Sequence, residues 1–215
     1  QDVSGADTDI VASFSSSVIA RVLQGAALGG FYCLGLEPHS GVRSPIPRVT
    51  PSDVRLEDVG LGHLPVTGDL DLVISPGAFP NLSFEPSEDT VQAFWPDLTI
   101  GLYGRIDETR VRIARVTVDA EFGLRPFLPN EPGQQSDRSI PFRLESLRVE
   151  NVSFSSDWRS EESAPREIDR WARRLTNLAF DSALTLPLPF EPMATATLTS
   201  ATLRQHDLLV GWNLD

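Results

Sequence analysis

Few histidine and cysteine side chains are available in this chain for catalysis or metal binding. The three histidines, His39, His63 and His206, lie far apart in turn-like segments, and Cys33 is the single cysteine. None of them has the Cys or His spacing of a metal site, and no nucleophile elbow, phosphate loop or dinucleotide fingerprint is present. We therefore predict a protein that is not an enzyme and needs no metal or cofactor. A serine triad assembled from distant residues stays open as the enzymatic alternative.

The charge of the chain argues against nucleic acid as a partner. The formal net charge is −12, and all 18 basic residues are arginine. A nucleic-acid-binding surface needs many cations to release the counterions of the phosphates. Charge alone also disfavours adsorption to an anionic membrane. No run of residues is long and apolar enough to predict a membrane span.

Length and composition predict one domain. The 215 residues are 40% hydrophobic, which is enough for a large core. No linker divides the chain, so we expect a flexible lead-in over residues 1–7 and a single domain over residues 8–215. Residue 1 is Gln and the only methionine is Met193. We therefore expect either a fragment or a chain whose leader was removed on export to the periplasm or the exterior of a bacterial cell.

A wide apolar stripe predicts a long helix that begins near Thr8. The stripe contains Ile10, Val11, Phe14, Val18, Ile19, Val22, Leu23 and Ala26. Thr8 or Asp9 would cap the start of this helix, and the glycines at 25, 29 and 30 would end it. The opposite face is small: Ser13, Ser15, Ser16, Ser17 and Ala20. We expect this helix to be buried on both sides and to lead into a short strand over 31–36.

Alternating apolar residues predict strands through the middle of the chain. The predicted strands cover residues 54–60, 70–74, 93–106, 111–127 and 142–154. The alternation slips at Ala114–Arg115 and again within 142–154. Such a slip is typical of a β-bulge, which bends a strand and increases its twist. Long, curved hairpins of this kind allow a sheet to wrap around another element.

The last third of the chain predicts a second helix and two terminal strands. Pro165 suits a first helical position. An apolar stripe follows it: Ile168, Trp171, Ala172, Leu175, Leu178 and Ala179. Prolines interrupt residues 184–189, and alternation then predicts strands over 194–203 and 208–214. The order is helix, five or six strands, helix and two strands, which indicates an α+β fold.

Several of these segments resemble bactericidal/permeability-increasing-type (BPI-like) proteins. Leu186-Pro-Leu-Pro189, followed by residues 196–214, resembles the close of their C-terminal barrel. Residues 11–30 look like their first long helix, and Leu82-Ser-Phe-Glu-Pro86 with the strand at 98–104 is similar to their central region. The resemblance covers residues 8–215, one whole tubular lipid-binding (TULIP) barrel. It implies a long curved antiparallel sheet wrapped around a long N-terminal helix, with a second helix before the two last strands.

The resemblance also implies a function. A TULIP-like barrel holds acyl chains in an apolar tube between helices and sheet, where each buried methylene contributes about 0.8 kcal/mol. We therefore expect a lipid-binding or lipid-transfer module whose partner is a lipid or another apolar ligand. The candidate lining residues are Ile10, Phe14, Val18, Val22, Trp171, Leu175 and Leu178. The alternative for each of them is an ordinary core position.

The chain departs from the family pattern in two respects. Bactericidal members are cationic and recognise lipopolysaccharide with basic tips, whereas this chain is acidic. The bridging cysteines of the family are also missing, because Cys33 stands alone. An endotoxin-killing role is therefore not expected. The alternative function is a structural or accessory subunit of a larger assembly, in which the barrel holds no lipid and its partner is a protein or a second barrel.

Overall fold

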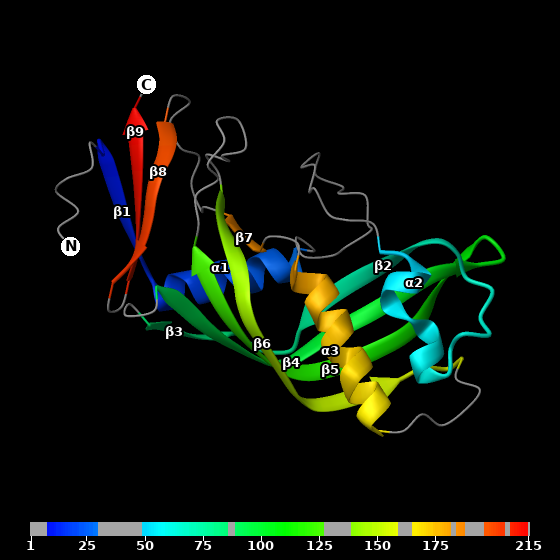
Figure 1. Cartoon of the computed structure of the whole chain (residues 1–215). Helices are drawn as coiled ribbons and strands as arrows, with labels where there is room; N and C mark the ends of the chain where they lie inside the picture. Colours follow the sequence, from blue (N-terminus) through cyan, green and yellow to red (C-terminus); the bar gives the residue numbers. More distant parts are fainter. Residues whose placement is uncertain are drawn as a thin grey trace.

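The computed structural model describes residues 8–29, 49–85, 89–126, 139–158, 165–181, 184–187, 196–204 and 207–214. Within these ranges the strands form a six-stranded and a three-stranded sheet, and all their pairings are antiparallel. Helices pack beside the sheets (Figure 1). The α+β class predicted from the sequence is therefore correct.

The six-stranded sheet contains the long central strands. Its members are β2 (Thr67–Pro76), β3 (Asn81–Glu85), β4 (Thr90–Ile106), β5 (Thr109–Pro126), β6 (Ser139–Ser155) and β7 (Leu184–Pro187). The order is β2-β4-β5-β6-β7, and β3 also pairs with β4. One face of the sheet is buried through alternate residues such as Leu72, Ile100 and Val116. The predicted central strands are confirmed, whereas β3 is an additional strand.

The predicted bulges are present in β5 and β6. Leu102 of β4 pairs with Ala114 of β5, but the next residue, Tyr103, pairs with Arg112. Ile113 is therefore the extra residue, adjacent to the slip predicted at Ala114–Arg115. The pairing of β5 with β6 contains two further register shifts. Bulges at these points bend the strands and increase their twist.

The N-terminal segment differs from the prediction of one long helix. Residues Ile10–Ser15 form strand β1, and helix α1 covers only Ser16–Leu28. Thr8 and Asp9 therefore do not cap a helix. β1 pairs along its whole length with β9 (Asp207–Leu214), from the other end of the chain. This tertiary pairing overrides a local apolar pattern that suits a helix as well as a strand.

The two terminal strands are confirmed, but they lie outside the large sheet. β8 (Ala196–Leu203) and β9 form a hairpin, and β9 lies between β8 and β1 in the three-stranded sheet. Figure 1 shows this sheet, formed by the first and the last two described strands, at one end of the molecule.

Helix α1 connects the two edges of the six-stranded sheet. It contacts β2 and β3 at one edge and β7 at the other. Ile19 and Leu23 are buried, whereas Val18 and Leu28 are exposed. The expectation that this helix is buried on both sides is therefore wrong, because the sheet covers one face only.

The prediction of a short strand over residues 54–60 is also wrong. Helix α2 (Pro51–Val54) and the 3-10 helix η2 (Leu56–Val59) occupy this segment. A capping box starts α2: Thr50 accepts from the backbone N–H of Asp53, whose carboxylate accepts from the N–H of Thr50. Hydrogen bonds from the side chain and the backbone of Thr50 lower the pKa of Asp53 from its ordinary value.

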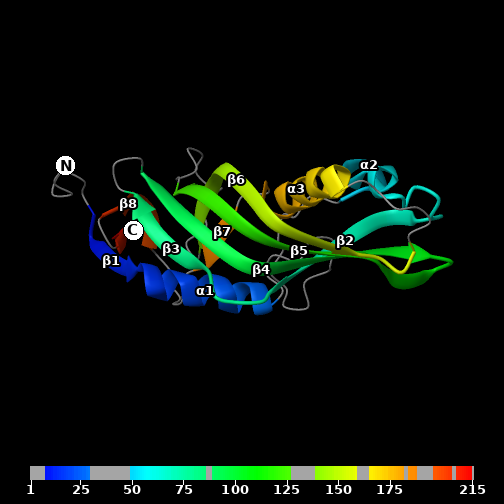
Figure 2. The same cartoon turned by 90° about the horizontal axis from the view of Figure 1, so that it is seen from below.

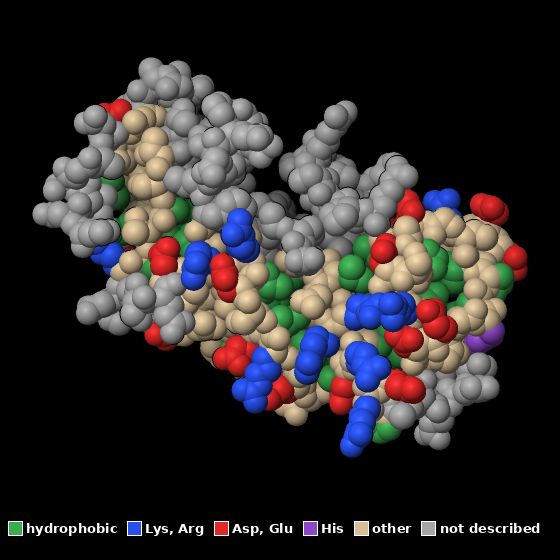
Figure 3. Space-filling view, viewed as in Figure 1, with side chains coloured by type: hydrophobic (Ala, Val, Ile, Leu, Met, Phe, Trp, Pro, Cys, Tyr) green, Lys and Arg blue, Asp and Glu red, His purple; other side chains and the backbone are tan. Residues whose placement is uncertain are grey.

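Helix α3 (Pro165–Asp181) confirms the second predicted helix. It packs on β6, α2 and η2 through the predicted stripe, in which Trp171, Ala172 and Leu175 are buried. Its exposed charged residues are Arg166, Glu167, Asp169, Arg170 and Arg173. In Figure 3, arginine and carboxylate side chains are interspersed over this part of the surface.

Two predicted segments, the lead-in over 1–7 and the strand over 31–36, lie outside the described residues. Among the helices that the structure does describe, none has the length and apolar character needed to cross a membrane.

Candidate ligand-binding site

The candidate lining residues from the N-terminal segment have different surroundings. Ile10 and Phe14 lie on β1, and Val18 and Val22 lie on α1. Phe14 is buried, and Val22 is partly buried against the core. Ile10 and Val18 are 36% and 41% exposed. These four residues therefore do not line a single enclosed space.

The three candidates from α3 lie in or against the hydrophobic core. Trp171 and Leu175 are buried, and Leu178 packs partly buried against the same core. The Trp171 ring meets the ring of Phe154 edge to face, with centroids 5.5 Å apart. Such an aromatic contact stabilises the attachment of α3 to the sheet. These surroundings match the alternative of an ordinary core position, and ligand contact by these residues stays a prediction.

The two groups of candidates belong to separate parts of the structure. The main contacts of α1 are with β1, β2, β3 and β7, whereas those of α3 are with β6, α2 and η2. Figure 2 shows α1 along one side of the six-stranded sheet and α3 with α2 on the other side. The structure therefore divides the seven candidates between two places.

A hollow of about 530 Å³ lies beside α1. We call it the α1 hollow; it is lined by Ser16, Ser17, Ala20, Arg21, Phe79, Pro80, Asn81 and Leu82. The first four residues come from one face of α1, and the others come from the start of β3 and the connection before it. Its volume falls in the range of small-molecule sites.

The lining of the α1 hollow is mixed, with an apolar part and one cation. Phe79 is 61% exposed although its ring is large and apolar. Leu82 and Ala20 add further apolar surface, and Arg21 is the one charged residue of the lining. The Arg21 side chain forms no ion pair or hydrogen bond with another residue of the described ranges. This arrangement fits an amphipathic ligand with an apolar part and an anionic group.

Local features of the chain explain why this space exists. Ser16, Ser17 and Ala20 have small side chains and share one helix face, so they leave room above α1. The two residues before Phe79 are hydrogen-bonded to β4. The indole N–H of Trp95 donates to the carbonyl of Ala78 at 2.9 Å, and the backbone N–H of Gly77 donates to Asp97 at 3.1 Å.

Sequence reasoning found one half of the α1 hollow and missed the other. The sequence predicts the small face of residues 13–20, but as part of a helix that is buried on both sides. It predicts no ligand contact for Phe79 or Leu82. A signal for Phe79 does exist, because it is a large apolar residue between Gly77 and Pro80, in a segment that must be a surface turn.

No constellation for metal binding is present in the ranges that the structure describes, where no three His, Cys, Asp or Glu side chains come together.

Comparison with known proteins adds little to this picture. No family model matches the chain, and no curated protein sequence matches it. Among solved structures the chain is similar to "Crystal structure of lipopolysaccharide binding protein", over 96% of this chain and 40% of that chain, with 11% identity and a TM-score of 0.34. The chain thus spans well under two thirds of the length of that protein. This is a distant fold relationship and carries no argument about ligand or activity.

Proposed function

We propose that the chain is a non-enzymatic, BPI-like (TULIP-type) module that binds or transfers a lipid or a similar amphipathic ligand. The observation that carries this proposal is the α1 hollow, in which Phe79 and Leu82 face the small side of α1. The resemblance found in the sequence supports the same class of ligand. The proposal includes export from a bacterial cell, which signal-peptide processing and cell fractionation would test.

The proposed site works by burying apolar surface beside a cation. An acyl chain in the α1 hollow would cover the exposed ring of Phe79, and burial of apolar surface contributes about 25 cal/mol per Å². Arg21, at the same hollow, would pair with an anionic group of the ligand. Arg21 would thus favour fatty acids or anionic lipids over neutral ones.

Binding of a fluorescent fatty acid to the delipidated full chain tests the proposal. Phe79→Ala is expected to weaken binding roughly tenfold, which corresponds to about 1.4 kcal/mol. Ala20→Trp, which fills the hollow, is expected to abolish binding. Arg21→Gln is expected to reduce the preference for the fatty acid over its uncharged methyl ester. Val18→Trp is the matched control, because Val18 is an exposed residue of the same helix outside the hollow.

The outcomes separate the two candidate functions. Failure of the folded wild-type chain to take up acyl probe, or equal binding by the wild type and Ala20→Trp, overturns the proposal. A structural or accessory subunit is the second candidate, and the exposure of Val11 and Leu28 favours it. For that function we expect no acyl uptake and instead a stable complex that Val11→Asp weakens.

A further inference from the structure

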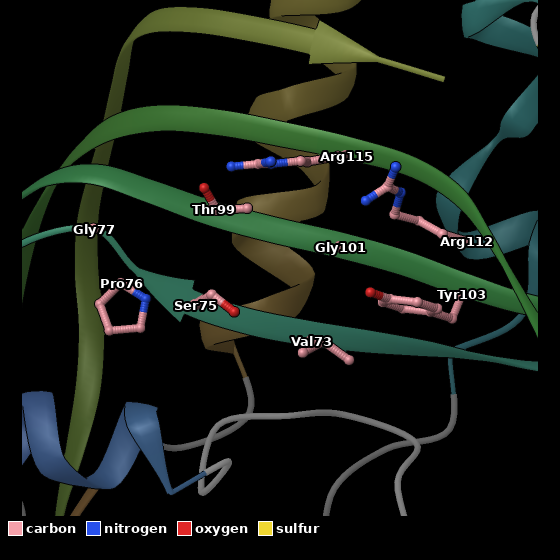
Figure 4. Close-up of a pocket in the computed structure, with 9 residues that line it drawn as sticks. All are labelled: Val73, Ser75, Pro76, Gly77, Thr99, Gly101, Tyr103, Arg112 and Arg115. Carbon is pink, nitrogen blue, oxygen red and sulfur yellow. The ribbon is translucent and has the colours of Figure 1, made fainter. Parts of the chain in front are cut away.

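A second hollow lies on the outward face of the six-stranded sheet. It has a volume of about 370 Å³ and is lined by Val73, Ser75, Pro76, Gly77, Thr99, Gly101, Tyr103, Arg112 and Arg115 (Figure 4). We call it the sheet-face hollow. Its lining residues on β2 and β4 alternate with the buried residues Leu72, Ile74 and Ile100, so they lie on the face turned away from the core. It is therefore distinct from the α1 hollow.

The bulge in β5 places two arginines at this hollow. In a regular strand, residues three apart point to opposite faces. Ile113 is the extra residue of the bulge, so Arg112 and Arg115 both lie on the outward face. The bulge is held in place by two residues that follow β6. Ser156 Oγ donates to the carbonyl of Ile113 at 2.6 Å, and Trp158 Nε1 donates to that of Arg112 at 3.0 Å.

The two arginines of the hollow are poorly neutralised. The Arg115 side chain has no ion pair or hydrogen bond with another described residue. Arg112 approaches Asp157 only to 3.9 Å, and the Asp157 side chain is 89% exposed. None of the nine lining residues is acidic.

The neighbouring arginine on β5 shows the contrast. Arg110 forms an ion pair with Asp71 at 2.8 Å, and its guanidinium lies 4.7 Å from the centre of the Tyr103 ring. Its charge is thus already paired, whereas the charges of Arg112 and Arg115 are available to a ligand.

Two hydroxyl groups and a glycine complete the hollow. Ser75 and Tyr103 supply hydroxyl donors, and in Figure 4 the Tyr103 hydroxyl points along the strand toward Gly101. The Thr99 hydroxyl shares a hydrogen bond with that of Thr117 at 3.0 Å. A Cβ atom at Gly101 would lie 2.9 Å from Cε2 of Tyr103, so the missing side chain leaves room for this ring beside the hollow.

We propose that the sheet-face hollow binds the phosphate group of a phosphate ester. Guanidinium groups bind phosphate oxygens through paired N–H donors, and the hydroxyls offer further donors to a group that has several acceptor oxygens. The chain as a whole is acidic, so the attraction comes from these two arginines and not from net charge. A soluble phosphate ester and a phospholipid headgroup share this chemistry. The site does not depend on the function proposed for the α1 hollow.

Titration of the full chain with phosphate-bearing probes tests this proposal. The probes are glycerol 3-phosphate, and phosphatidylcholine vesicles with and without phosphatidic acid, at an ionic strength held constant with sodium chloride. Saturable binding of glycerol 3-phosphate identifies a soluble ester. Binding of the phosphatidic acid vesicles alone identifies a headgroup. Either result supports the site if it depends on the two arginines.

Variants decide whether the arginines carry the binding. Arg115→Ala is expected to weaken it roughly tenfold or more, because hydrogen bonds to charged groups contribute about 1.5–3 kcal/mol. Arg112→Ala combined with Arg115→Ala is expected to abolish it. Gly101→Val, which would displace the Tyr103 ring without changing a charge, is expected to weaken binding as well. Arg125→Ala is the matched control, because Arg125 lies on the same strand outside the hollow and is similarly exposed.

Any of three results overturns the proposal. The first is the absence of saturable binding of every phosphate probe by the folded wild-type chain. The second is binding that the double arginine variant retains. The third is binding that Arg125→Ala weakens as much as Arg115→Ala does. Thermal unfolding of each variant establishes that a loss of binding is not a loss of folding.

Discussion

At the scale of single residues, Asp119 joins three strands on the outward face of the sheet. From β5 its carboxylate accepts the backbone N–H of Asp97 in β4 at 2.9 Å and Nδ2 of Asn151 in β6 at 2.7 Å. Asp97 and Asn151 have φ angles of 51° and 50° and lie at register shifts. This left-handed conformation is unfavourable for most residues, although Asp and Asn tolerate it. One carboxylate therefore holds two bulges in place.

Asp119 should accordingly give the fold a pH-dependent stability. The hydrogen bond from Asn151, and next that from Asp97, lower the pKa of Asp119 below its ordinary value of 3.8. Its contribution is therefore complete above the ordinary pKa and is lost as the pH falls through the folded-state pKa. Because the group is partly exposed, we expect Asp119→Ala to lower the free energy of unfolding by about 1 kcal/mol at neutral pH. Urea denaturation at a series of pH values measures this difference.

Glu121→Ala provides the comparison for Asp119→Ala. Glu121 lies exposed on the same strand, and its side chain has no hydrogen bond or ion pair with another described residue. We expect Glu121→Ala to change the free energy of unfolding little at any pH. The difference in this free energy between Asp119→Ala and the wild type is expected to shrink below about pH 4. An equal loss of stability in both variants, or a pH-independent loss in Asp119→Ala, would show that the Asp119 carboxylate does not act through its hydrogen bonds with Asp97 and Asn151.

At the scale of elements, local patterns decide what the sequence can predict. The β4–β5 hairpin was predicted because its alternation and its turn at Asp107–Glu108 lie in one continuous segment. Helix α3 was predicted because a stripe follows Pro165 without interruption. Helix α2 was missed because Val54 and Leu56 alternate like a strand, while the capping box of Thr50 and Asp53 starts a helical turn.

Helix α3 also allows a test of whether a predicted lining residue belongs to the core. Leu175 is 1% exposed in the core cluster, so Leu175→Ala is expected to lower the free energy of unfolding by about 2–5 kcal/mol. Asn177→Ala, at an exposed position of the same helix, is expected to change it by less than about 0.5 kcal/mol. Urea denaturation and the fatty-acid titration are measured on both variants. A small loss of stability with a large loss of fatty-acid binding would place Leu175 in a ligand site instead.

At the scale of the whole molecule, the sequence predicts least where distant segments meet. The three-stranded sheet joins β1 to β9 from opposite ends of the chain, and such a pairing leaves no local signal. The apolar residues of β1 match a helical period, so the local pattern favours the wrong element. The half of the α1 hollow that carries Phe79 was missed for the same reason, because Phe79 meets the small face of α1 only after the sheet has formed.

The pairing of β1 with β9 predicts how a shortened chain behaves. Deletion of residues 1–15 removes β1 and leaves the backbone N–H and C=O groups on that edge of β9 unpaired, beside buried Leu208, Val210 and Trp212. An exposed apolar edge strand promotes pairing with a second chain. We therefore expect this deletion to lower the urea midpoint and to cause concentration-dependent self-association in sedimentation velocity. Deletion of residues 1–7 alone leaves β1 intact and should do neither. If the chain without residues 1–15 stays monomeric and keeps the urea midpoint of the wild type, β1 does not protect the edge of β9.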